Sequence, residues 1–231
     1  MSELQARLDR LALRLDRMGM RCEQAVIDAV AAVRRSDIDA GQAVDAGDAV
    51  VDREEVEIEQ ECIRLLALYQ PAAVDLRTIC TFIKVNSDLE RIADLAASIA
   101  RRAKRVAQDN VALDEYEAFE HLAQATLDIL GRTVRILSSA EVASARRIID
   151  ADALIDKGYG HLVRSVLEDD ARGDRSPEGA GAAMTVIQLA KALERIGDHC
   201  TNIAEDIIFL RTGDIVRHRS AQEPTDQSHP A

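Results

Sequence analysis

Pairs of carboxylate side chains four residues apart recur along this sequence, and two of the pairs repeat in one register further down the chain. In a helix this spacing puts both side chains on one face, where their oxygens can bind a common partner. Spacing alone is weak evidence, since 41 of the 231 residues are Asp or Glu. The pairs are Asp48/Asp52, Glu90/Asp94, Asp152/Asp156 and Glu194/Asp198.

The direction of these pairs separates them from an ordinary solvated helix face. Glu90 and Asp94 fall in the same helical sector as Leu76, Ile79 and Ile83, so they continue an apolar stripe. An apolar stripe packs against a neighbouring helix. We therefore expect this acidic pair to face another helix.

The preceding helix supplies acids that can meet this pair. Its acidic face consists of Asp48, Asp52, Glu55 and Glu59. If the two helices pack antiparallel, four or more carboxylates converge. In the second half Tyr159 and Val163 stand where the first half has the two Glu residues, while Asn202 and Glu205 extend the face of Glu194 and Asp198.

Converging carboxylates repel one another and resist desolvation, so they need protons, basic side chains or cations. We interpret them as metal ligands. Oxygen ligands suit Mg, Mn, Ca or Fe, and Zn and Ni stay open because availability also sets identity. The predicted ligands are Asp48, Asp52, Glu55, Glu90, Asp94, Asp152, Asp156, Glu194, Asp198, Asn202 and Glu205.

An alternative without metal is open at this point. Arg91 and Arg195 follow Glu90 and Glu194 directly and could fold back as ion-pair partners. A ferritin-like di-iron site is disfavoured, because it uses a Glu-x-x-His motif that the sequence lacks. His199 follows Asp198, so it points elsewhere and is expected to form a packing or hydrogen-bonding contact.

Six helices are needed to position these residues. Apolar spacing and breakers predict helices over residues 2–35, 37–69, 73–106, 114–139, 141–170 and 177–211. The segment 89–94 matches 193–198, and Asp48 and Asp52 match Asp152 and Asp156, both at an offset of 104 residues. We therefore predict an all-α fold of two tandem antiparallel three-helix bundles, with units 1–108 and 109–213 and a disordered tail over 214–231.

Composition narrows the class of protein. A net charge of −12 argues against a nucleic-acid binder. The sequence shows no signal peptide or membrane span, and its four scattered cysteines fit a reducing compartment, so we expect a cytoplasmic protein. Five arginines (7, 10, 14, 17 and 21) line one flank of the first helix; we favour a solvated flank over a docking stripe for an acidic partner.

Two segments resemble the PhoU family of phosphate-transport regulators. They are LERIGDHCTNIAE at 193–205, and QPAAVDLR at 70–77 with LERIAD at 89–94. The resemblance implies a homodimer of two three-helix bundles that binds metal clusters at the four acidic pairs. It also implies a non-enzymatic role: coupling a phosphate ABC importer to a sensor histidine kinase and restraining uptake and the starvation response when phosphate is plentiful.

The sequence departs from the family pattern at two positions in its first half. Ala93 replaces the usual Gly, and Arg101 stands where the second half has Glu205. These changes predict a first site of different charge or metal load. The alternative function is a metal-dependent hydrolase or oxidase on the same bundle, which would require an open coordination position and a general base.

Overall fold

The computed structural model describes residues 2–113, 116–172 and 177–216. These residues fold as helices joined by short connections, with no strand among them. The helices are α1 (Glu3–Arg34), α2 (Ile38–Tyr69), α3 (Ala73–Arg101), α4 (Ala103–Gln108), α5 (Glu117–Ser139), α6 (Val142–Arg172) and α7 (Pro177–Thr212). Of the predicted tail, residues 217–231 lie outside the described part of the chain.

The helix ends follow from local chemistry. The Ser2 hydroxyl accepts a hydrogen bond from the Gln5 backbone N–H, and Asp37 caps α2 by accepting one from Ala40. The chain leaves α2 through Gln70, whose φ of 44° is left-handed, and Pro71 follows. The predicted helix over residues 37–69 is thus confirmed.

The predicted third helix, residues 73–106, is wrong in one respect, because it is broken at Arg102 into α3 and α4. The Arg102 backbone N–H donates to the carbonyl of Ile99, which is a tighter turn than an α-helix. The Arg102 guanidinium meanwhile donates to the Ser98 carbonyl, the usual partner of that N–H. The side chain thus replaces one helical hydrogen bond.

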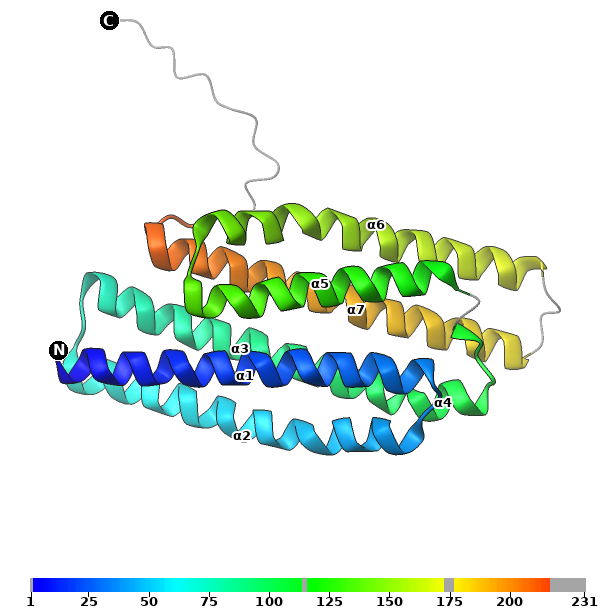
Figure 1. Ribbon diagram of the computed structural model, residues 1–231, viewed down its shortest axis with the longest axis horizontal. Coiled ribbons are helices and arrows are strands. Elements are labelled where there is room, and N and C mark those ends of the chain that lie inside the picture. Colours follow the sequence, from blue (N-terminus) through cyan, green and yellow to red (C-terminus); the bar gives the residue numbers. More distant parts are fainter. Residues whose placement is uncertain (1, 114–115, 173–176, 217–231) are drawn as a thin grey trace, which may run out of the picture.

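Six of the helices in the described ranges form the two predicted antiparallel three-helix bundles, which lie side by side. In Figure 1, α1, α2 and α3 make one bundle, α5, α6 and α7 make the other, and α4 links them at one end. The bundles meet along α3 against α7 and α1 against α5. Among the described residues no helix is long and apolar enough to cross a bilayer.

The offset of 104 residues is visible in side-chain contacts. The Cys22 thiol donates to the Leu89 carbonyl over 3.2 Å, and the equivalent Thr126 hydroxyl lies 3.4 Å from the Leu193 carbonyl. Each bond ties the first helix of a bundle to its third helix. The two halves therefore share internal packing as well as sequence.

The contact between the halves is itself symmetric. Lys84 Nζ lies 3.0 Å from Asp206 Oδ1 across α3 and α7. By the repeat offset of 104 residues, Lys84 is equivalent to Gln188 and Asp206 to Arg102. These two equivalents also meet, because the Arg102 Nε donates to Gln188 Oε1 over 3.3 Å. A pseudo-two-fold axis therefore passes between α3 and α7.

Three of the five arginines that flank the first helix are ion-paired with α2. Arg7 pairs with Glu61 at 3.3 Å and Arg14 with Glu57 at 2.8 Å. Arg21 also pairs with Glu54. Partly exposed pairs of this kind each stabilise a fold by about 0–1 kcal/mol. These ion pairs indicate that the arginines on this flank support the packing of α1 on α2.

Candidate metal centre

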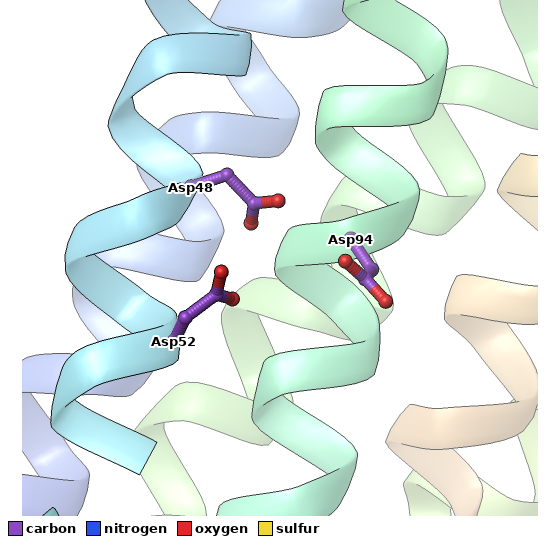
Figure 2. Close-up of side chains that lie close together, drawn as sticks. All are labelled: Asp48, Asp52 and Asp94. Carbon is purple, nitrogen blue, oxygen red and sulfur yellow. The ribbon is translucent and has the colours of Figure 1, made fainter. Parts of the chain in front are cut away.

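The first acidic group lies between α2 and α3. Figure 2 shows Asp48 and Asp52 projecting from α2 toward α3, which carries Asp94. One carboxylate oxygen from each residue lies within 4.8 Å of the others. Antiparallel packing of two acidic helix faces has brought these oxygens together, as predicted, at a separation that one cation can bridge.

The second acidic group lies between α6 and α7. It contains Asp156 from α6 with Glu194 and Asp198 from α7, again with one oxygen from each within 4.8 Å of the others. Asp156 and Asp198 are the equivalents of Asp52 and Asp94. The groups differ in the third member, which is Asp48 in the first half and Glu194 in the second.

Three other predicted ligands lie beside these groups. Burial and then the nearby charge of Asp94 raise the pKa of the Glu90 carboxyl. Burial and then the charges of Glu59 and Asp52 raise the pKa of the Glu55 carboxyl. Burial and then the charges of Asp156 and Asp198 likewise raise the pKa of the Asp152 carboxyl. These carboxylates form a rim around the central oxygens.

The three converging carboxylates of the second half do not include Glu205, and the ligand roles of Asn202 and Glu205 stay predictions. The Asn202 amide donates to Asp88 on α3, over 3.4 Å. His199 Nδ1 lies 2.8 Å from the same Asp88 oxygen, which agrees with its predicted hydrogen-bonding role. The helix turns Asn202 away from the acidic group and toward the other bundle, a direction that the sector of one helix alone does not reveal.

Burial and mutual repulsion raise the pKa values of several of these carboxyls. Burial is the largest cause for Asp48, followed by the charges of Asp52 and Asp94. For Asp152, burial and then the charges of Asp156 and Asp198 raise the pKa to about 6, although the Thr201 hydroxyl acts in the opposite direction. The same order of causes, burial before like charge, raises the pKa values of Glu55, Glu90 and Asp198.

Basic side chains compensate part of this charge. Arg91 lies 3.4 Å from Glu90 and 3.3 Å from Asp94, so the predicted fold-back of this arginine occurs. In the second half Lys191 pairs with Glu194 at 2.5 Å. Ion pairing and metal binding are therefore both compatible with these positions.

Two oxygen atoms favour an additional cation. Asp48 Oδ1 and its equivalent Asp152 Oδ1 are buried and have no hydrogen-bond partner within the described ranges. A buried carboxylate oxygen without a donor is costly unless a proton or a cation satisfies it. Asp48 also lines a groove of about 590 Å³ between α1 and α2. The residues present thus fit a hard metal ion.

One basic residue near these groups, Lys191, was missed from the sequence, whereas Arg101 was expected to change the charge of the first site. Lys191 was not considered, although its position three residues before Glu194 on a helix signals the pair. Arg101 forms an ion pair with Asp45, 2.5 Å away, and its charge lowers the pKa of Asp48. Arg101 thus acts on the first group from its edge.

Comparisons with known proteins agree with the repeat. The family model described as "PhoU domain" matches residues 15–103 and again 119–207, which are 104 residues apart. The phosphate-specific transport system accessory protein PhoU homolog of Rhizobium meliloti is 35% identical, covering 92% of this chain and 89% of the relative. The phosphate-specific transport system accessory protein PhoU of Escherichia coli is 31% identical over 96% of this chain and 90% of its own length.

Solved structures share the fold. The crystal structure of PhoU from Pseudomonas aeruginosa matches with a TM-score of 0.84 at 30% identity, covering 92% of this chain and all of that one (100%). The phosphate transport system regulatory protein PhoU from Streptococcus pneumoniae gives the same TM-score at 24% identity, over 93% of this chain and 99% of the other. The second comparison supports the fold alone.

Proposed function

The chain belongs to the PhoU family, and from this membership we propose that it is a non-enzymatic accessory regulator of phosphate transport. Its partners would be a phosphate ABC importer and a sensor histidine kinase, which it would couple in the cytoplasm as a homodimer. When phosphate is plentiful it would restrain uptake and the starvation response. The observation that carries the proposal is the double match of one family model over most of the chain.

The names of the relatives support an accessory role over the alternative of a metal-dependent hydrolase or oxidase. Those proteins are described as accessory proteins of a transport system. The carboxylates of this chain suit binding of a cation, and Arg91 and Lys191 already occupy part of their oxygens. We assign the acidic groups to structure and sensing and propose no chemical step for them.

We further propose that the acidic groups bind metal ions. Asp48, Asp52 and Asp94 would hold the ion in the first half, and Asp156, Glu194 and Asp198 in the second, with Asp152, Glu55 and Glu90 nearby. The bound ion would supply positive charge that joins two helices of a bundle. The converging oxygens and the unsatisfied Asp48 and Asp152 atoms support this assignment.

Deletion of the gene tests the regulatory role. In phosphate-rich medium the deletion strain, in a background without a second family member, should switch on a phosphate-starvation reporter. The wild-type gene supplied on a plasmid should silence it. A reporter that stays silent after deletion would contradict the proposed regulation, whatever the metal content of the protein.

A further inference from the structure

Lys191 pairs with Glu194, one of the three carboxylates of the second acidic group. Its Nζ lies 2.7 Å from Oε1 and 2.5 Å from Oε2 of Glu194, so both oxygens of that carboxylate face one ammonium. The Lys191 side chain is 49% exposed whereas that of Glu194 is 12% exposed. The ammonium thus approaches a partly buried carboxylate from the solvent side and can swing back into water.

Tyr159 on α6 holds the ammonium in place. Lys191 Nζ lies 5.3 Å from the centroid of the Tyr159 ring, within the range of a cation–π contact. The lysine is therefore bracketed by a carboxylate on its own helix and an aromatic face on the neighbouring helix. This bracket spans the same two helices, α6 and α7, that form the acidic group.

The first half lacks this arrangement. The positions equivalent to Tyr159 and Lys191 are Glu55 and Ser87. Where the second half has an aromatic ring and an ammonium, the first half thus has a carboxylate and a hydroxyl. Arg91 approaches the first group more loosely, because its guanidinium lies 3.3 Å from one oxygen of Asp94 and 3.4 Å from one oxygen of Glu90.

We propose that Lys191 is a built-in competitor of the metal ion at the second acidic group, so that the first group fills at a lower metal concentration than the second. A cation that binds Glu194 must displace the ammonium from both oxygens, and the freed lysine moves into solvent. In the first group the basic contact is weaker, because Arg91 meets one oxygen of the half-exposed Asp94 at 3.3 Å. This inference rests on the metal binding proposed above, and it adds the order in which the two acidic groups fill.

Calorimetric titration of the purified, chelator-treated protein with Mn²⁺ tests the proposal. Asp52→Asn with Asp94→Asn disables the first group and isolates the second, and Asp156→Asn with Asp198→Asn does the converse. With the first group disabled, Lys191→Gln should tighten Mn²⁺ binding about tenfold, because it removes a unit charge in contact with a ligand. With the second group disabled, the same substitution should leave the affinity unchanged.

Matched variants separate charge at the ligand from charge on the surface. Arg195→Gln removes an exposed cation from the same helix and should change the affinity of the second group by less than about twofold, as for a screened surface charge. Tyr159→Leu should tighten binding in the same direction as Lys191→Gln but less, and Tyr159→Phe, which keeps the ring face, should behave as wild type.

The outcomes distinguish this proposal from the one on which it rests. Mn²⁺ binding that Lys191→Gln does not alter, or a second group that fills before the first, would overturn the role of Lys191 while leaving metal binding intact. No Mn²⁺ binding in any variant, including wild type, would overturn both metal proposals, yet the deletion phenotype would still decide the regulatory one.

Discussion

Gly197 of α7 packs so closely on Ile155 of α6 that a Cβ at residue 197 would lie 2.8 Å from the Ile155 Cδ1 atom. The equivalent residues in the first half are Ala93 and Val51, both buried. The second half has the smaller residue, Gly197, on its third helix and the larger, Ile155, on its second helix. The first half has the larger Ala93 opposite the smaller Val51. The departure of Ala93 from the family pattern is thus balanced by the loss of one methyl group at residue 51.

This exchange predicts energetic coupling between residues 155 and 197. Gly197→Ala gains helix propensity of about 1 kcal/mol but overpacks the core by about 1–3 kcal/mol, so the free energy of unfolding should fall. Ile155→Val alone should cost about 1 kcal/mol. Combined with Gly197→Ala it should cost less than the sum of the two single changes, giving a coupling of about 1 kcal/mol in a double-mutant cycle measured by urea unfolding. Strict additivity would contradict the close contact.

The ion pair between the bundles predicts a second stability effect. Asp206 is 2% exposed, and Lys84→Met removes the ammonium 3.0 Å from it. Losing the charged partner of a buried carboxylate should lower the free energy of unfolding by about 1–3 kcal/mol. Gln188→Ala, at the equivalent but exposed position, should change it by less than about 0.5 kcal/mol. Equal losses in the two variants would show that burial of Asp206 does not matter.

Asp152 predicts a dependence of stability on pH in the metal-free protein. Its pKa is raised from 3.8 to about 6 in the folded state, so the folded protein holds this proton more tightly than the unfolded chain does. Stability from this group is therefore present below about pH 4 and is lost as the pH rises through about 6.

The contribution of Asp152 can be isolated by difference. Between pH 4 and 7 the wild type should lose about 1 kcal/mol relative to Asp152→Asn, a value reduced for solvent screening at this half-buried position. Denaturant unfolding at several pH values in the presence of a chelator measures this difference. Asp150→Asn, an exposed site on the same helix, serves as the control and should run parallel to wild type.

Metal binding predicts a shift in the thermal midpoint. An ion that binds only the folded state at 100 times its Kd stabilises it by about 2.7 kcal/mol, so Mn²⁺ should raise Tm and a chelator should reverse the rise. Differential scanning calorimetry measures the shift. Asn at positions 52, 94, 156 and 198 together should abolish it, whereas Asp128→Asn on the surface of α5 should not. A shift that survives the fourfold substitution would place the ion elsewhere.

The fold was predictable because long apolar stripes and few breakers leave little choice. Leu8, Leu11, Leu15, Met18 and Cys22, which recur along α1 at spacings of three and four residues, are all buried. The break at Arg102 was not predictable, because it depends on a side chain that competes with its own backbone for the Ser98 carbonyl. Neither helix propensity nor periodicity carries that information.

The acidic groups were predictable to the extent that two helices define them. Asp52 and Asp94, and likewise Asp156 and Asp198, meet because antiparallel packing follows from short connections. The direction of Asn202 was not predictable, because it depends on the first bundle, where Asp88 of α3 accepts its hydrogen bond. Packing between the repeats is a property of the whole chain, and the pattern along one helix does not encode it.

The axis between α3 and α7 has a consequence for the origin of the chain. Because equivalent positions meet across it, a single three-helix ancestor could have made the same contact with another molecule of itself, as two identical subunits. Joining the two subunits in one gene freed each half to change independently. The pair at 84 and 206 is now lysine with aspartate, while its counterpart at 188 and 102 is glutamine with arginine. The halves are no longer interchangeable, so a circularly permuted chain with the repeats in reverse order would keep these contacts. Two copies of the first repeat would instead place lysine opposite arginine at both positions, and two copies of the second would place glutamine opposite aspartate.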